Sequence, residues 1–253
     1  MFRAYLNTAS TLLRQSSKYI LQNMDRIDRV KFTKNPKTKQ TENSVELAIE
    51  ADIIKRLHEL YPTHSILSEH AGLVEAVEPQ SDEHFVWILD PIDGSANFVN
   101  GLPDYAVCLS LFENRRCVMS LVYQPVTDDL FTATLDHGAL YNGKKIRAKR
   151  TQSHHSPVVL LAGHHPFHEM VSELSTVSKR SFDLDQIRSL GSVSLSLAYH
   201  ATGASDVFYA RNVSICQAAA GLLIASEAGA SVKQNRSGDI MIDRIMSTLS
   251  AKS

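Results

Sequence analysis

The sequence has few of the features that mark extracellular, membrane-spanning or nucleic-acid-binding proteins. It contains only three cysteines, Cys108, Cys117 and Cys216, and no two of them form a CxxC pair. An odd number of widely spaced cysteines argues against a disulfide framework and against a zinc site. We therefore expect three small apolar cysteines, most of them buried, and a cytoplasmic location.

Net charge and long apolar runs are also missing. The formal net charge of the 253 residues is −1, so no overall field attracts nucleic acid or an acidic membrane. No apolar run approaches the roughly 20 residues that a membrane-spanning helix needs. The segment 1–20 does not resemble a signal peptide, because its apolar residues recur at helical spacing between polar ones. It predicts an amphipathic helix packed on a core, and neither a membrane nor a nucleic acid is expected as a direct partner.

The first half of the chain combines helix patterns with a series of strand patterns. The basic, polar segment 31–44 predicts a loop, and Asn43 with Glu46 three residues later has the spacing of a capping box at the start of a helix. An Asn-Gly pair within 139–147 predicts a hairpin. Strands are predicted over 64–70, 85–89, 105–112, 117–123 and 129–134.

After residue 157, strand and helix patterns alternate. Strands are predicted over 157–163 and 206–210, and helices over 192–203 and 215–229, each ending at a glycine. The histidines of 163–168 have no acidic or cysteine partner nearby in the sequence and are expected at the surface or in a loop.

The predicted fold class is therefore a layered protein of mixed helix and sheet. We expect an α+β half over about 1–150 and an α/β half over about 151–253. No Gly/Ser-rich linker separates the two halves, so they are expected to pack as one domain over 1–253.

Three carboxylates stand at the ends of predicted strands: Glu69, Asp90 and Asp93. The two aspartates belong to the stretch WILDPIDGSANF, 87–98, which reads as a strand followed by a Pro/Gly turn. Such residues suit an ordinary turn. They also suit a Mg²⁺ site, because Mg²⁺ prefers carboxylate oxygens and completes its shell with water and substrate phosphate. A helix beginning near Gly94 would add backbone N–H groups that face an anion. Residue chemistry alone leaves both explanations open.

The same stretch resembles the signature of the inositol monophosphatase family, W-[IV]-[IL]-D-P-[IL]-D-G-[TS]-x-N-F, at every position. The resemblance extends over roughly residues 44–230, through YPTHSILSEH, LFTATLDHGALYNGKKI, SLGSVSLSLAYHATGASDVFY and GLLIASEAGA. It implies a layered αβαβα sandwich of the sugar-phosphatase type. It further implies a homodimer and a Mg²⁺-dependent, lithium-sensitive phosphatase.

The resemblance also implies which residues bind metal. Glu69, Asp90 and the backbone carbonyl of Ile92 would hold the first Mg²⁺, and Asp90 with Asp93 would hold the second. The carboxylates of an empty metal site repel one another. On that basis Asp93→Asn would leave folding nearly intact, and the melting temperature of the metal-free protein would stay the same or rise.

Further positions are implied to serve the reaction. Ser95 would stand beside the attacking water, and Glu46 would orient the Ser95 hydroxyl. The phosphate would be lined by Gly94, Ser95, Gly191 and Ser192.

Three departures from the family pattern involve four positions. His70 stands where the family commonly has a second acidic residue, and Ala210 where it has a glutamate that contacts the sugar. Cys216 and Gln217 stand where it has a Trp-Asp pair whose aspartate completes the second metal site. The amide oxygen of Gln217 can bind metal without charge, so we expect two or three Mg²⁺ ions with a weak second site.

The leading hypothesis is a Mg²⁺-dependent phosphomonoesterase that hydrolyses inositol monophosphate or a related small sugar phosphate by direct attack of metal-activated water. A fructose-bisphosphatase or a nucleotide 3′-phosphatase of the same family stays open, because the sugar-contacting position is Ala210. A hypothesis of another class is a catalytically weakened relative that acts as a protein-binding factor of the transcription machinery. The altered second site suits that alternative.

Overall fold

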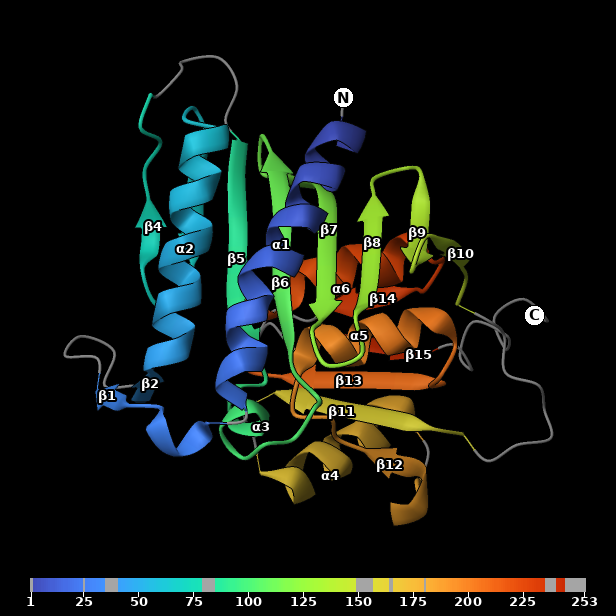
Figure 1. Cartoon of the computed structure of the whole chain (residues 1–253). Helices are drawn as coiled ribbons and strands as arrows, with labels where there is room; N and C mark the ends of the chain where they lie inside the picture. Colours follow the sequence, from blue (N-terminus) through green and yellow to red (C-terminus); the bar gives the residue numbers. More distant parts are fainter. Residues whose placement is uncertain are drawn as a thin grey trace.

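The computed structural model describes residues 2–24, 26–34, 41–78, 85–148, 157–163, 166–179, 181–234 and 240–243. These residues form five layers (Figure 1). Helices α1 (Phe2–Met24) and α2 (Ser44–Leu60) cover one face of an eight-stranded sheet. Helices α5 (Val193–Thr202) and α6 (Ile215–Glu227) fill the space between this sheet and a five-stranded sheet, and α4 (Phe167–Ser178) covers the far face. The predicted αβαβα sandwich is confirmed.

The eight-stranded sheet has the order β10-β9-β8-β7-β6-β5-β3-β4. Its strands are β3 (Ser65–Ser68), β4 (Gly72–Val74), β5 (Phe85–Asp93), β6 (Ala106–Glu113), β7 (Arg116–Gln124), β8 (Asp129–Thr134), β9 (Gly138–Tyr141) and β10 (Lys144–Ile146). Only β3 and β5 are parallel neighbours; the other pairs are antiparallel. The predicted hairpin is present, with Asn142 and Gly143 both at positive φ between β9 and β10.

The five-stranded sheet has the order β12-β11-β13-β15-β14. Its strands are β11 (Val159–Gly163), β12 (Ile187–Arg188), β13 (Val207–Arg211), β14 (Val232–Gln234) and β15 (Ile240–Asp243). Strand β11 is parallel to β12 and β13, and β15 is antiparallel to its neighbours. Strands β11 and β13 and helices α5 and α6 were predicted; β12, β14, β15 and α4 were not.

One loop prediction is wrong in part. Within 31–44, strands β1 (Phe32–Lys34) and β2 (Thr41–Asn43) pair as an antiparallel ribbon, whereas residues 35–40 lie outside the described part. Of the histidines expected at the surface or in a loop, His168 is exposed on α4, and the two at 164 and 165 are outside the described residues. The predicted cap is present, because the Asn43 side chain accepts hydrogen bonds from the backbone N–H groups of residues 45 and 46.

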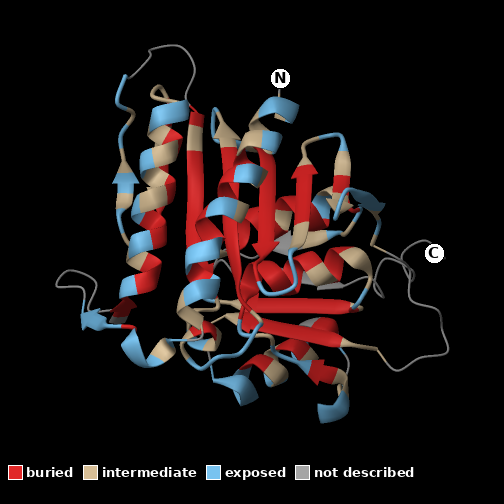
Figure 2. Cartoon of the chain, viewed as in Figure 1, coloured by how far each residue is buried: buried red, intermediate tan, exposed pale blue. Residues whose placement is uncertain are grey.

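The alternation of side chains along β5 shows how the sequence separates the layers. Strand β5 is buried over nearly its whole length (Figure 2). Trp87 and Leu89 belong to the core under α1 and α2, whereas Ile88 packs on Cys216 of α6. Successive side chains of a strand point to opposite faces, so Asp90 shares the face of Ile88 and points toward α6. An aspartate in the middle layer of the sandwich is fully surrounded by protein.

Helices α5 and α6 cross closely in this middle layer. A Cβ on Gly221 would lie 2.5 Å from Cβ of Leu197, so only glycine permits the approach. Near the crossing, the Ser194 hydroxyl donates to the Gln217 carbonyl at 2.5 Å. The beginnings of both helices therefore lie together, close to the end of β5. Within the described residues, no helix has the length and apolar character needed to cross a membrane.

Candidate metal and phosphate site

A cleft of about 350 Å³ opens where β5, α5 and α6 meet. Most of the predicted site residues line it: Glu46, Glu69, Ile92, Asp93, Gly94, Ser95, Gly191 and Gln217. Asp90 and Ser192 are fully buried and do not contribute to the lining. The chain thus gathers residues from positions 46 to 217 around one cavity.

The two aspartates do not lie in the turn that the sequence predicts, because β5 continues through both of them. Asp90 pairs with Cys108 of β6, and Asp93 pairs with Ala106. Three steps along β5 therefore match two steps along β6, which is one extra residue and hence a bulge. Residues three apart in a regular strand point to opposite faces. The extra residue lets both carboxylates approach the same region.

Helix α3 (Ser95–Val99) begins directly after the bulge, as predicted. Gly94 precedes it with φ of +99°, and a Cβ there would lie 2.9 Å from the Asp104 carbonyl oxygen. The Ser95 hydroxyl donates to the Ile92 carbonyl at 3.2 Å. Only glycine fits at position 94, so the backbone at this side of the cleft is bare.

The signature residue Asn97 fixes the opposite side of the cleft. Its amide nitrogen donates to the carbonyls of Asp104 and Leu190, both at 2.6 Å. A Cβ on Gly191, which has φ of +76°, would lie 2.7 Å from that same nitrogen. Asn97 thereby holds the 190–191 backbone against α3, and no side chain at 191 fills the space.

Asp93 caps helix α5. Its carboxylate accepts hydrogen bonds from the Ser192 hydroxyl at 2.6 Å and from the backbone N–H groups of Ser194 at 2.6 Å and Val193 at 3.2 Å. Burial raises the pKa of Asp93 to about 6, although these three hydrogen bonds oppose the shift. Because the Ser192 hydroxyl is bound to Asp93 and buried, it does not face the cleft as the sequence led us to expect.

Asp90 is an isolated polar group at the site. Its side chain is 0% exposed, and neither carboxyl oxygen has a hydrogen-bond partner. Burial raises its pKa well above the ordinary value, and the charges of Glu69 and Asp93 raise it further. Glu69 acts mainly as a nearby charge, since no contact between the two carboxyls meets hydrogen-bond geometry. Such a group is stable as a protonated acid or beside a cation.

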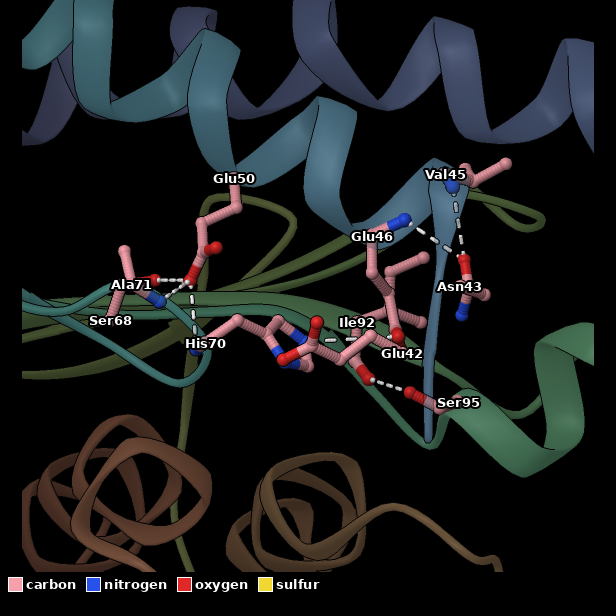
Figure 3. A network of polar contacts seen from close by, with 10 residues as sticks. All are labelled: Glu42, Asn43, Val45, Glu46, Glu50, Ser68, His70, Ala71, Ile92 and Ser95. Atoms are coloured by element: carbon pink, nitrogen blue, oxygen red, sulfur yellow. Dashed lines mark hydrogen bonds and ion pairs between the residues drawn. The ribbon is translucent and has the colours of Figure 1, made fainter. Parts of the chain in front are cut away.

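His70 occupies the position where the family pattern has a second acidic residue. Its Nε2 lies 3.7 Å from Oε2 of Glu46, and its Nδ1 lies 3.5 Å from Oε1 of Glu42 (Figure 3). Both glutamates are buried. The predicted partner of Glu46 was the Ser95 hydroxyl, but that hydroxyl donates to Ile92 instead. In this structure the Glu46 carboxyl therefore faces His70, and no hydrogen bond joins it to Ser95 among the described contacts.

The Glu46 carboxyl is a much weaker acid than an ordinary glutamate. Burial raises the pKa of Glu46 to about 8; hydrogen bonding from Asn43 opposes the shift, and the charges of Glu69 and Glu50 add to it. At neutral pH the carboxyl consequently keeps its proton in the metal-free protein.

Glu50 is a site residue that the sequence analysis missed. It lies one helical turn after Glu46 on α2 and is buried. One of its oxygens accepts hydrogen bonds from the Ser68 hydroxyl, from His70 N at 3.0 Å and from Ala71 N at 3.1 Å. The spacing of four residues from Glu46 was the available signal, because it places both glutamates on one helix face.

Gln217 is in the cleft, but its side chain has a structural partner. The Gln217 side-chain oxygen Oε1 accepts a hydrogen bond from the Ser214 backbone N–H at 3.1 Å. The Gln217 backbone N–H donates to the Ser214 hydroxyl at 3.2 Å. This reciprocal pair is a capping box at the start of α6. Ala210, the other departure, is fully buried in β13 and outside the cleft lining.

The donor set suits a hard divalent cation at Asp90 and Glu69. Carboxylate and carbonyl oxygens are the ligands such ions prefer, and the unpartnered Asp90 oxygens are free to bind one. In the described part of the chain, no three acidic, histidine or cysteine side chains already stand in an arrangement that encloses a metal. Water and substrate would therefore supply a large share of the ligands. The oxygens of Asp93 and Gln217 are engaged with α5 and α6, so a second ion would have to compete with helix caps.

Comparison with known proteins places these features in context. A sequence model of the inositol monophosphatase family matches residues 3–246. The Nus factor SuhB of Pseudomonas aeruginosa is 32% identical over 230 residues, which cover 88% of this chain and 83% of the relative.

Solved structures agree with the sequence relatives. The extragenic suppressor protein SuhB of Bartonella henselae superposes with a TM-score of 0.82 at 25% identity, covering 98% of this chain and 96% of that one. An IMPase of Thermotoga maritima superposes with a TM-score of 0.77 at 26% identity, covering 100% of this chain and 96% of that one. The similarity thus extends over the whole sandwich.

Proposed function

Because the chain belongs to the inositol monophosphatase family, we propose that it is a metal-dependent phosphomonoesterase acting on inositol monophosphate or a related small sugar phosphate. One observation carries the proposal. Asp90 is buried with two unpartnered oxygens and lies beside Glu69, which lines a cleft whose walls at Gly94 and Gly191 are bare backbone. A cation at the carboxylates and a phosphate at the backbone would satisfy both halves of the cleft.

We propose Mg²⁺ as the cation, held by Glu69, Asp90 and the Ile92 carbonyl. When bound, Mg²⁺ would lower the pKa of a coordinated water and neutralise charge on the phosphate. The Ile92 carbonyl already accepts one hydrogen bond from Ser95 and has a second lone pair available. Asp90 would lose its proton on binding, since its raised pKa reflects a metal-free environment without any positive partner.

The protein's own groups would then orient the phosphate and the attacking water. The backbone at Gly94, Ser95 and Gly191 lines the phosphate side of the cleft. The Ser95 hydroxyl can accept a hydrogen bond from water while it donates to Ile92. Glu46 lines the same cleft and keeps its proton near neutral pH in the metal-free protein. A cation bound in the cleft would favour loss of that proton, and the resulting carboxylate is the group we assign to accept the water's proton through Ser95.

The second metal position is proposed as weak. Asp93 would have to share its oxygens between α5 and the ion, and Gln217 would have to give up its bond to Ser214. Two or three ions, lithium sensitivity, the homodimer and the cytoplasmic location follow from the resemblance and stay predictions.

A second function is favoured by one specific finding. The relatives that match at 31–32% identity are named Nus factor SuhB. We infer that this chain also suits the role of a protein-binding factor in transcription. The capping box of Gln217 supports it, because a helix cap in place of a charged metal ligand preserves the fold while lowering catalytic power.

A panel of phosphate esters tests the first function. Phosphate release from inositol monophosphate, fructose bisphosphate and a nucleotide 3′-phosphate is measured from micromolar to high-millimolar Mg²⁺, with Asp90→Asn as the inactive control. Phosphate release from inositol monophosphate at the lowest Mg²⁺ supports the proposal. Faster release from another ester would assign that ester as the substrate and keep the phosphatase function. No release at any Mg²⁺, together with capture of transcription proteins by the immobilised chain, would favour the second function.

A further inference from the structure

The buried carboxylate of Glu50 makes contacts that the proposed reaction does not explain. Its side chain is 4% exposed, and a single oxygen, Oε1, accepts three hydrogen bonds. The three donors are the Ser68 hydroxyl, the His70 backbone N–H and the Ala71 backbone N–H (Figure 3). Hydrogen bonds to an ionised acceptor are roughly twice as strong as those between neutral groups.

These donors bracket Glu69. Strand β3 ends at Ser68 and β4 begins at Gly72, so residues 69–71 form the whole connection between them. Glu50 binds the residue before Glu69 and the two residues after it. The backbone on both sides of Glu69 is thus tied to α2, and the direction of the Glu69 side chain depends on that tie.

Glu50 does not itself face the cleft. It is absent from the cleft lining, which includes Glu46, Glu69 and His70 from the same two segments. Its bonded oxygen already has three donors. Glu50 therefore acts behind the wall of the cleft.

We propose that Glu50 is a positioning residue that fixes Glu69 relative to Glu46 and thereby sets the affinity of the cleft for a divalent cation. The proposal rests on the proposed function, since it takes Glu69 as a metal ligand. Its physical basis is that an ion binds more tightly when its ligands are already held in place, because less order is lost on binding. Partners that orient a metal ligand typically contribute 10–100-fold in metal affinity.

The arrangement also explains why one helix carries both glutamates. Glu46 and Glu50 are one turn apart on α2, a rigid element capped by Asn43. Glu46 faces the cleft and Glu50 holds the turn that presents Glu69. Any shift of α2 would therefore move both carboxylates of the cleft together.

Two measurements on the full chain test the proposal. The first is hydrogen exchange of the backbone amides of His70 and Ala71 in the metal-free protein, which needs no activity. The second is the Mg²⁺ dissociation constant from calorimetry. Both are made on Glu50→Ala, on Glu50→Gln, which keeps an acceptor oxygen but loses the charge, and on Glu59→Ala. Glu59 lies on the exposed face of the same helix, with its side chain 61% exposed.

We expect Glu50→Ala to exchange both amides faster and to bind Mg²⁺ roughly 10–100-fold more weakly, Glu50→Gln to fall between, and Glu59→Ala to match the natural protein. Unchanged exchange and unchanged Mg²⁺ affinity in Glu50→Ala would overturn the proposal. Loss of Mg²⁺ with unchanged exchange would also overturn it, because Glu50 would then be a ligand.

If Glu50→Ala does not fold, Glu50→Asp is measured in its place, because it keeps the charge but is one methylene shorter and so weakens the bonds to the His70 and Ala71 amides. Normal exchange and affinity in that variant would likewise refute the positioning role. Failure of the proposed function is distinct from either result: the natural protein would then bind no Mg²⁺, while the exchange of His70 and Ala71 would still report whether Glu50 holds the turn.

Discussion

Gln217→Asp is the substitution that most sharply separates a weakened metal site from a lost one. In the natural protein the Gln217 amide oxygen accepts the Ser214 N–H, and this bond caps α6. Aspartate is shorter by one methylene, so it gives up that bond. It adds a negative charge in the first turn of α6, which favours anions by about 0.3–1 kcal/mol. We therefore expect the stability of the metal-free protein to change by less than about 1 kcal/mol.

The effect on metal binding should be larger. Two unit charges about 4 Å apart attract by about 4 kcal/mol at an effective dielectric constant of about 20, and Mg²⁺ carries two charges. Most of that attraction is offset by loss of hydration. A residual gain of only about 1.4 kcal/mol lowers the Mg²⁺ midpoint tenfold. We expect at least this shift, together with a gain of lithium sensitivity.

The assay is phosphate release from inositol 1-phosphate as a function of Mg²⁺, with and without lithium. Gln217→Glu is the matched variant: it adds the same charge but keeps the length that reaches Ser214. A lower midpoint in the aspartate variant and a smaller shift in the glutamate variant is the expected order. Equal midpoints in all three proteins would refute the reasoning, because they would place the side chain at 217 away from the ion.

Three further predictions follow from the contacts of the site and the core. Asp93→Asn should abolish phosphatase activity and lower the free energy of unfolding of the metal-free protein by roughly 2 kcal/mol, because an amide cannot accept all three hydrogen bonds from the start of α5. Chemical denaturation measures this loss, and undiminished stability would contradict the role of Asp93 as a cap of α5. Ser95→Ala should lower kcat by roughly 10²–10⁴-fold with the Mg²⁺ midpoint unchanged, whereas Ser95→Thr should keep activity; full activity in the alanine variant would end the assignment. His64 accepts the Trp87 indole N–H, and burial lowers its pKa from 6.5 to about 4. The folded state thus binds the proton less tightly than the unfolded state, so up to about 3 kcal/mol of stability should be present above pH 6.5 and lost as the pH falls toward 4. Urea unfolding midpoints are measured against pH for the natural protein and for His64→Asn, which keeps an acceptor but does not titrate. The two midpoints should converge at low pH, and a constant difference between them would show that His64 is not the source of the pH dependence.

Local patterns were sufficient to predict much of the fold. The Asn43 cap, the Asn-Gly hairpin and the helices α5 and α6 depend on residues within a few positions of one another, and each is present. The strands β14 and β15 were missed because β15 takes its place in the sheet by pairing with β13, which is distant in the sequence, and β14 pairs with β15 in turn.

The candidate site shows the same division. The motif around Asp90 predicted the wall of the cleft that is formed by Ile92, Asp93, Gly94 and Ser95, because these residues adjoin one another in the chain. The remaining predicted residues came from the wider family resemblance. It could not predict that Asp93 caps α5, since its partner Ser194 lies 101 residues away. The expectation that Asp93→Asn leaves the metal-free protein stable is replaced for that reason. The hydrogen bonds between Glu50 and the backbone beside Glu69 could not be predicted either, because they join helix α2 to a hairpin 20 residues further along the chain.

The central claim is that Asp90 and Glu69 form a cation site that serves phosphate hydrolysis. Phosphate release from inositol 1-phosphate, titrated with Mg²⁺ in the natural protein and in Asp90→Asn, tests it most directly. The account predicts release that rises with Mg²⁺ in the natural protein and none in the variant, although the variant folds. Release without Mg²⁺, or equal release from Asp90→Asn, would contradict it.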